Sequence, residues 1–378
     1  MKTTAEAVII GGGIQGASLA YHLACRGLTD VCLVEMNDLG SGSTGRSASV
    51  IGHVSPRADC LALTELSFAA YMRFRDELDA DPGYRPIGYL MMAGAQSAPK
   101  LRRHHQLLQR GAIDSRLVDG DDIEDINDLV PGLNLEDIKV ALYGPSGGIL
   151  DPHSIVMAYA QRARHLGVQI SQRVKAMGLE VEGGQLLGLH TTAGFIATPR
   201  VVNAAGFRAR EVGAWAGMAL PISNLKRHIF VTGPVTLYSG SFSFTYEYEV
   251  GWYIRREGPG VLIGMGAVES DEEDPQVDWS FLDVVGEHTM HRAPALADAE
   301  IQSGWAGLRP MTPDENPILG EAPHLPGFFN DCGWGGHGVM HAPAGGLLMA
   351  EVILDGQATS ADVSSFRVER FEGWLAGG

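Results

Sequence analysis

The glycines that follow the first apolar segment constrain this chain most. Residues 5–10 form a short apolar run, and a G-x-G-x-x-G pattern follows at Gly11, Gly13 and Gly16. Residues 14–26 then have the composition of a helix. In a Rossmann unit the first glycine permits a tight turn, the second lets a pyrophosphate approach the backbone, and the third lets helix and strand pack closely. The segment therefore predicts an α/β fold that binds a dinucleotide.

An acidic residue stands where such a site needs one. A second apolar run, Val31–Glu35, ends in a carboxylate about 20 residues after the last of these glycines. At that position Glu35 is expected to accept hydrogen bonds from an adenosine ribose. NAD and FAD both fit this pattern, and a glycine-rich turn without a ligand is the alternative.

Two further segments favour FAD over NAD. Residues 36–49 are rich in small hydroxyl side chains around Arg46, which suits a backbone that lies along an extended cofactor. Residues 176–196 alternate like an antiparallel meander, between a helix capped by Asp151 and a strand in 200–206. A Rossmann unit interrupted by a meander is typical of two-domain flavoproteins.

Composition excludes several classes of function. The 378 residues include 28 basic and 45 acidic side chains, a formal charge of −17, so we expect no nucleic-acid partner. No apolar run approaches the roughly 18 residues of a transmembrane helix, and residues 1–7 do not resemble a signal peptide. The four cysteines show no C-x-x-C spacing, which favours a reduced, cytoplasmic setting. We predict no metal site.

The last third of the chain carries a family resemblance. The segments WAGLRPMTPDENPILGEAP (305–323) and GFFNDCGWGGHGVMHAPAGGLLMAEVIL (327–354) resemble the closing segments of the D-amino-acid oxidase superfamily. VDWSFLDVV, RAPALADAEI and FRVERF resemble the same group, so the similarity spans nearly the whole chain. Within it, the chain resembles glycine oxidase, the sarcosine oxidase β subunit and the dye-linked L-proline dehydrogenases.

The resemblance implies a two-domain α/β flavoprotein. We expect a Rossmann-like FAD-binding domain assembled from residues 1–85, 145–215 and 306–378. We expect a substrate domain, built on a mixed β-sheet, from residues 86–144 and 216–305.

A second glycine-rich loop lies near the C-terminus. CGWGGHG runs into a helix that should begin between Gly338 and Pro343 and end near Gly356. The helix N-terminus carries about half a positive charge, which would stabilise negative charge on the flavin pyrimidine edge. His337 could tune the flavin, or its backbone alone could matter. The predicted cofactor-binding residues are Gly11, Gly13, Ile14, Gln15, Gly16, Glu35, Met36, Ser43, Thr44, Arg46, Ser47, Ala48, Val174, Ala205, Gly206, Gly335, Gly336, His337, Gly338, Val339 and Met340.

Departures from the relatives matter as well. Monomeric sarcosine oxidase attaches its flavin through a cysteine that aligns with Gly307, and dimethylglycine dehydrogenase-like proteins use a histidine that aligns with Arg46. Neither anchor is present, so we expect non-covalent FAD. Two sarcosine oxidase lysines, one linked to oxygen reactivity and one to carboxylate binding, align with Leu262 and Met340. The acceptor is therefore left open between oxygen and a redox partner.

Tyr253 and Arg309 are the predicted substrate contacts. Residues 251–256 and 261–267 read as a hairpin whose alternation places Tyr253 and Trp252 on opposite faces. In glycine oxidase-like proteins the matching tyrosine lines the substrate pocket, and the arginine matching Arg309 holds the substrate carboxylate by a bidentate pair. A structural salt bridge for the arginine and plain packing for the tyrosine are the alternatives. We expect His104 and His105 to be solvated.

These features predict an FAD-dependent oxidoreductase that acts on a small-molecule amine or amino acid. The expected reaction is hydride transfer from a secondary or N-substituted amino acid to flavin N5, with no side chain as catalytic base. One alternative is the flavin subunit of a hetero-oligomeric amino-acid, opine or proline dehydrogenase that passes electrons to a partner. Others are a non-catalytic flavin-bound assembly subunit and an NAD dehydrogenase.

Overall fold

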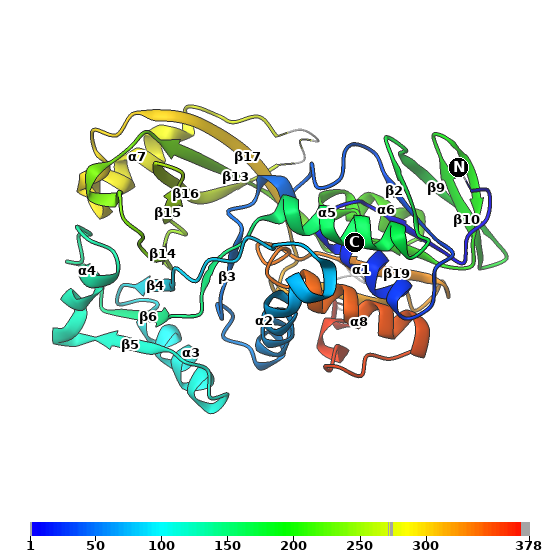
Figure 1. Ribbon diagram of the computed structural model, residues 1–378, viewed down its shortest axis with the longest axis horizontal. Coiled ribbons are helices and arrows are strands. Elements are labelled where there is room, and N and C mark those ends of the chain that lie inside the picture. Colours follow the sequence, from blue (N-terminus) through cyan, green and yellow to red (C-terminus); the bar gives the residue numbers. More distant parts are fainter. Residues whose placement is uncertain (1, 271, 273–274, 372–378) are drawn as a thin grey trace.

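Two large β-sheets occupy the two halves of the molecule (Figure 1). The computed structural model describes residues 2–270, 272 and 275–371. No helix within those residues is long and apolar enough to cross a membrane.

The six-stranded sheet contains the predicted Rossmann unit. Its strands are ordered β18-β19-β12-β1-β2-β8, all parallel except β18, which runs antiparallel to β19. β1 and β2 are almost wholly apolar because a parallel sheet is covered on both faces. The bounds are β1 Ala7–Ile10, β2 Val31–Glu35, β8 Gln169–Gln172, β12 Val201–Asn203, β18 Ile318–Glu321 and β19 Phe328–Cys332.

Different elements cover the two faces of this sheet. One face packs against α1, α5 and α8, and the other against α6 and a three-stranded antiparallel sheet, which is the expected meander. Asp151 caps α5 as expected, because its carboxylate accepts from the backbone N–H groups of His153 and Ser154. The bounds are α1 Ile14–Cys25, α5 Pro152–His165, α6 Ala209–Trp215, α8 Ala342–Asp355, β9 Ala176–Glu182, β10 Gln185–Thr191 and β11 Gly194–Ala197.

The eight-stranded sheet forms the other half. Its order is β17-β13-β16-β15-β14-β4-β6-β5, antiparallel except where β14 runs parallel to β4. The hairpin of β15 and β16 turns at residues 258–259, as predicted. The bounds are β4 Tyr89–Ala93, β5 Arg116–Asp119, β6 Val140–Gly144, β13 Ser223–Thr232, β14 Phe244–Glu247, β15 Tyr253–Glu257, β16 Gly260–Glu269 and β17 Ile301–Met311.

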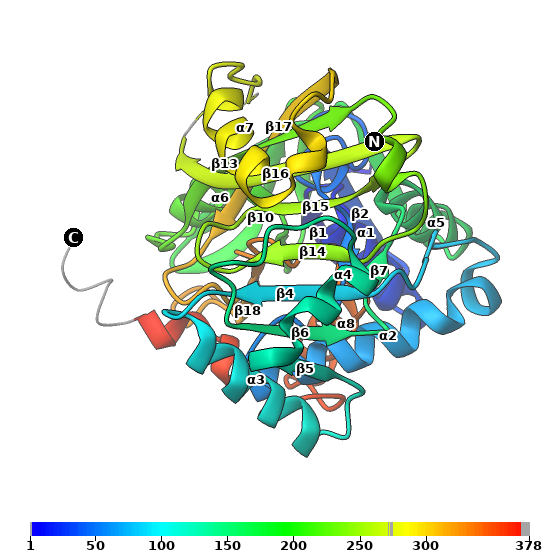
Figure 2. The same cartoon turned by 90° about the vertical axis from the view of Figure 1, so that its left-hand side faces the viewer.

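The two faces of this sheet have different surroundings, as Figure 2 shows from the side of α4 and α7. Trp252 and Ile254 point to the α7 side, whereas Tyr253 points to the side that holds α3. His104 of α3 is 2% exposed, so the expectation that it is solvated was wrong. It lies one helical turn from the buried Leu101 and Leu108 on the inner side of the helix. The helix bounds are α2 Ala58–Leu78, α3 Ala98–Arg110, α4 Ile126–Leu129 and α7 Phe281–Arg292.

Connections between the halves bring the two sheets together. A two-stranded sheet pairs β3 (Val50–Ile51) with β7 (Gly148–Ile149). β17 belongs to the eight-stranded sheet and runs past residue 306, where the sequence predicts a domain boundary.

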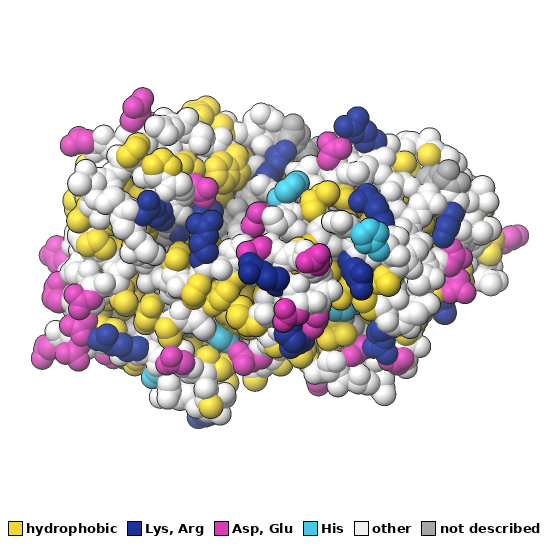
Figure 3. Space-filling view, viewed as in Figure 1, with side chains coloured by type: hydrophobic (Ala, Val, Ile, Leu, Met, Phe, Trp, Pro, Cys, Tyr) yellow, Lys and Arg dark blue, Asp and Glu magenta, His cyan; other side chains and the backbone are white. Residues whose placement is uncertain are grey.

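Acidic side chains gather at the far end of the half that contains the eight-stranded sheet, over α4 and β5, with Asp121, Asp122, Glu124 and Asp125 exposed (Figure 3).

Candidate functional site

Three cavities meet end to end between the two sheets. The first and second share the lining residues Gly13, Ser43, Thr44, Ala204 and Gly206. The second and third share Ala48, Val50, Arg227, Tyr253, Arg309 and Gly336. The arrangement is an elongated site with a separate chamber at one end, which suits a dinucleotide and a small second ligand.

The turn after β1 forms the floor of the first cavity. Gly11 has φ +112°, and a Cβ there would lie 2.3 Å from the carbonyl oxygen of Ala204. Only glycine allows this approach between β1 and the segment after β12. The turn thereby opens a backbone-lined space large enough for phosphates.

Glu35 ends β2 at the first cavity, beside Met36 and Val174. Its carboxylate accepts hydrogen bonds from the backbone N–H of Gly12 at 2.7 Å and of Asn37 at 2.8 Å. Two carboxylate oxygens offer about four acceptor positions, so hydroxyl groups of a ligand can still bind here. These contacts fix the carboxylate at the wall of the first cavity.

Side chains of α1 and α2 hold the C-terminal glycine-rich loop against the second cavity. The Gln15 side-chain amide donates to the carbonyl of Gly338 at 2.8 Å, and the Ser18 hydroxyl donates to the carbonyl of Ala342 at 2.7 Å. The Tyr71 hydroxyl donates to the carbonyl of Val339 at 2.6 Å. The start of α8 is thereby fixed beside the N-terminus of α1.

Asp331 is a buried acid on the wall of the second cavity. It lies in β19, and one carboxylate oxygen accepts from the indole N–H of Trp334 at 2.7 Å. The other oxygen has no partner among the described residues. Burial raises the pKa of Asp331 to about 7, and the Trp334 bond only partly opposes this shift.

Arg309 and Tyr253 lie at the junction of the second and third cavities. Arg309 is on β17, and a Cβ at Gly336 would lie 2.8 Å from its guanidinium carbon. The glycine therefore leaves the space that the guanidinium occupies. Tyr253, on β15, is 2% exposed and stacks on Phe244.

Arg227 joins these two residues from β13. Arg309 pairs with Leu225 in the register between β13 and β17, so Arg227 is its diagonal neighbour on the same face. Burial, and next the charge of Arg309, lower the pKa of Arg227 to about 10. The alternation in NLKRHIFVT predicts a strand and the face on which Arg227 lies. It does not show which strand pairs with it.

His337 faces the third cavity from the glycine-rich loop. Burial lowers its pKa to about 4, and the positive charge of Arg309 acts in the same direction. The imidazole is therefore neutral near pH 7 and adds no charge beside the two arginines.

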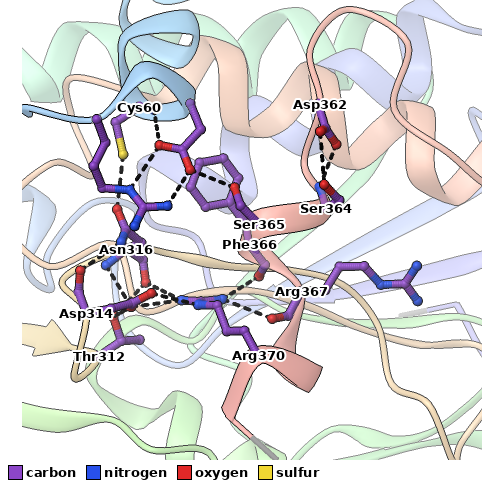
Figure 4. A network of polar contacts seen from close by, with 12 residues as sticks. Cys60, Thr312, Asp314, Asn316, Asp362, Ser364, Ser365, Phe366, Arg367 and Arg370 are labelled. Carbon is purple, nitrogen blue, oxygen red and sulfur yellow. Dashed lines mark hydrogen bonds and ion pairs between the residues drawn. The ribbon is translucent and has the colours of Figure 1, made fainter. Parts of the chain in front are cut away.

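A polar network fixes the rim of the third cavity (Figure 4). Arg370 forms an ion pair with Asp314 at 2.8 Å and donates to the carbonyl of Asn316 at 2.9 Å. The Cys60 thiol of α2 donates to the side-chain oxygen of Asn316 at 3.0 Å. The segment 312–316 is thus tied both to α2 and to the end of the described chain.

The three cavities bring the predicted residues together. All of the predicted cofactor-binding residues except Gly16 line one of them, with His337 and Met340 in the third only. Gly16 lies beneath the turn, where a Cβ would meet the carbonyl oxygen of Gly11. Their roles in binding FAD stay predictions. The sequence interpretation missed Arg227 and Asp331.

Comparison with known families assigns the chain to a class. Residues 6–352 match the family described as "FAD dependent oxidoreductase". The chain belongs to this family, which confirms the predicted family, cofactor and enzyme class and excludes the NAD alternative.

Particular relatives agree with this assignment. L-proline dehydrogenase from P. horikoshii is 27% identical, with a TM-score of 0.90 and 99% of both chains covered, which confirms the fold class. Sarcosine oxidase subunit beta of Rhodobacter capsulatus is 24% identical over 98% of this chain and 89% of that protein. Mitochondrial dimethylglycine dehydrogenase of Rattus norvegicus is 30% identical over 94% of this chain. The chain spans only 44% of that relative's length.

Replacing Glu35 tests the ribose contact. We expect Glu35→Ala to lose a charge-assisted hydrogen bond of about 1.5–3 kcal/mol, which weakens FAD binding roughly 10- to 150-fold. Glu35→Gln keeps one acceptor and should lose less. Titration of the apoprotein with FAD measures the dissociation constants, and an unchanged value in Glu35→Ala would place the ribose elsewhere.

Replacing Asp331 tests its raised pKa. Between about pH 4 and pH 7 the folded protein binds more protons here than the unfolded chain, so the free energy of unfolding falls as the pH rises. The loss is at most about 1.4 kcal/mol per pH unit. Asp331→Asn removes this titration and keeps the acceptor for Trp334. The Tm of the variant minus that of the parent should therefore increase from pH 5 to pH 8, whereas parallel profiles would contradict the assignment.

Proposed function

We propose that the chain binds FAD non-covalently in the first two cavities and oxidises an amine in the third. The substrate we propose is a secondary or N-substituted amino acid. The observation that carries this proposal is the Arg309 guanidinium, which faces the junction beside the glycine-rich loop and forms no ion pair with any described residue.

The contrast with Arg292 supports a ligand-binding role for Arg309. Arg292 is fully buried and forms ion pairs with Glu247 at 2.9 Å and with Asp137 at 2.9 Å. A structural arginine in this protein thus has acidic partners, as expected for a buried charge. Arg309 presents a bidentate donor that has no acidic partner among the described residues, which matches a ligand carboxylate.

The reaction removes two electrons from the amine. FAD bound here would supply a two-electron acceptor for the hydride of the α C–H bond, and oxygen or a redox partner would reoxidise it. A neutral secondary amine would lose its N–H proton to solvent as the C=N bond forms, and water could then hydrolyse the imine to a carbonyl compound and an amine.

The chain's own residues orient the substrate. Arg309 would hold the carboxylate, and the buried ring of Tyr253 would limit the position of the amine at the junction. With a pKa of about 4, His337 is a weak base at neutral pH and need not take part in proton transfer. The N-terminus of α8 would stabilise negative charge on the flavin.

The names of the relatives support an N-substituted amino acid. Dimethylglycine, sarcosine and L-proline appear in those names, and each carries a carboxylate and a substituted nitrogen. Anaerobic mixing with proline, sarcosine, glycine, D-amino acids and opine-type compounds tests the proposal. Bleaching of the flavin by one of them is expected, and no bleaching by any would favour the non-catalytic assembly subunit.

A second candidate is a flavin subunit that passes electrons to a partner chain. Leu262 is fully buried between β15 and β13 at the position of the oxygen-linked lysine, and the similar sarcosine oxidase protein is itself named as a subunit. Co-purifying chains, and reoxidation that is slow with oxygen but fast with an artificial acceptor, would support it.

We also propose the domain division given above and a cytoplasmic location. The strands of the six-stranded sheet fall within the proposed cofactor domain and those of the eight-stranded sheet within the proposed substrate domain, except that β17 continues to Met311. The four cysteines are free.

Acid precipitation tests the attachment of the flavin. Gly307 and Arg46 align with the two residues through which relatives attach their flavin covalently. The two positions are adjacent, since a Cβ at residue 307 would lie 2.9 Å from the Cβ of Arg46. Neither residue forms a flavin bond, so precipitated protein should be colourless and the supernatant yellow. A yellow pellet would show a covalent linkage.

Arg309→Lys tests carboxylate binding. A lysine cannot reproduce the two parallel donors of a guanidinium, so the apparent KM for amino-acid substrates should rise strongly. Complete loss of one partner of a buried charge pair costs about 3–5 kcal/mol, which sets the upper limit. The bound flavin spectrum should not change, and the matching amine without a carboxylate should lose little. Equal loss with both substrates would show that Arg309 supports the fold.

A further inference from the structure

The junction of the second and third cavities contains more positive charge than one carboxylate requires. Arg227 and Arg309 both line it, and about 7–8 Å separates such diagonal neighbours on adjacent strands. One Arg227 nitrogen donates to the carbonyl of Gly251 at 3.1 Å, and its Nε has no hydrogen-bond partner within the part of the chain that the structure describes. Neither arginine forms an ion pair with a described residue.

Two buried arginines elsewhere in this half have acidic partners. Arg255, on the neighbouring strand β15, forms an ion pair with Glu257 at 2.5 Å, and Arg292 of α7 pairs with Glu247. Arg227 and Arg309 differ from both in having no ion pair with a described residue. Burial lowers the pKa of Arg227, and repulsion from the like charge of Arg309 acts in the same direction.

The acids that line the cavities do not supply the missing charge. In the third cavity these are Asp314, which is paired with Arg370, and Glu315, which is exposed at the rim. Asp331 lines the second cavity, but one of its oxygens accepts from Trp334 and the other has no partner among the described residues, so it forms no hydrogen bond or ion pair with either arginine. Among the described residues neither arginine has an acidic partner, so an anionic ligand would fit at the junction.

We propose that the substrate carries two carboxylates, the α-carboxylate bound by Arg309 and a second one bound by Arg227. This inference rests on the proposed amine oxidation and narrows its substrate class to dicarboxylic secondary amino acids. The second carboxylate can belong to the nitrogen substituent or to the amino-acid side chain, because both bring an anion a few bonds from the amine. Lys100, above the ring of Tyr248 at the third cavity, adds positive charge on the same side.

Three secondary amines that share the glycine unit test the proposal. They are sarcosine with one carboxylate, iminodiacetate with the second carboxylate on the nitrogen substituent, and N-methylaspartate with the second on the side chain. Anaerobic stopped-flow reduction of the flavin gives the apparent Kd of each. At least one dicarboxylate should bind roughly 10- to 100-fold more tightly than sarcosine. The preferred one identifies the source of the second carboxylate.

Arg227→Gln should remove this preference. The variant is expected to lose the 10- to 100-fold gain while its apparent Kd for sarcosine changes less than about 3-fold. Arg227→Lys keeps the positive charge but lacks the two parallel N–H donors of a guanidinium, so it should retain part of the tighter binding of the dicarboxylate. Lys226→Gln is the matched control, because Lys226 is the next residue on the opposite face of β13, paired with Glu272. It should change neither value.

Binding of unreactive anions separates this inference from the proposed function. Glutarate should raise the Tm of the FAD-loaded protein more than butyrate does, and Arg227→Gln should abolish the difference. This result would support a two-carboxylate site even if no amine bleached the flavin. Equal effects of glutarate and butyrate on the parent protein, or equal weakening of sarcosine and dicarboxylates by Arg227→Gln, would overturn it.

Discussion

The close contact between α1 and α8 is the constraint on which the rest of the site depends. A Cβ at Gly346 would lie 2.3 Å from the Ser18 hydroxyl oxygen and 2.7 Å from the Ser18 carbonyl carbon. The two helices therefore pack almost backbone to backbone, and Ser18 bonds the carbonyl of Ala342 across the contact. Ser18 and Ala342 are 324 residues apart in the chain, so this packing brings the first and last glycine-rich loops to one cavity.

The position of the glycine-rich loop in turn sets the position of Arg309. The loop passes directly beneath the guanidinium at Gly336, and any larger residue would displace it. β17 is hydrogen-bonded along its length to β13, so the strand that presents Arg309 also fixes Arg227 beside it. The cofactor half thus supplies the surface, and the eight-stranded sheet supplies the charges that face it.

Local patterns in the sequence predicted the elements that depend on near neighbours in the chain. Gly11, Glu35 and the cap at Asp151 could be predicted because a turn, a strand end and a helix start are set by adjacent residues. The family resemblance added Tyr253 and Arg309, whose roles no spacing reveals. The prediction that His104 is solvated was wrong because α3 is basic on one face only, and His104 lies on its buried face.

The place of Arg227 in the site could not be predicted from the sequence for a different reason. The position of Arg227 beside Arg309 comes from the register of β13 against β17, strands that lie about 80 residues apart. Its lack of an acidic partner among the described residues likewise depends on the tertiary fold. A sequence shows which side chains alternate along a strand, but not which strand becomes the neighbour. Asp331 is similar, because its raised pKa depends on burial by segments from both ends of the chain.

The charge at the junction also bears on the chemistry itself. Hydride transfer adds negative charge to the flavin, and a nearby substrate carboxylate disfavours that step unless its own charge is compensated. One arginine per carboxylate keeps the local charge balanced before the electrons move, while the neutral imidazole of His337 leaves that balance unchanged. A substrate with a single carboxylate would leave one positive charge in excess. That charge would favour the reduced flavin, but the substrate would bind less tightly than a dicarboxylate. For a monocarboxylate, Arg227 would therefore favour flavin reduction without adding much to affinity, whereas for a dicarboxylate it would contribute to both.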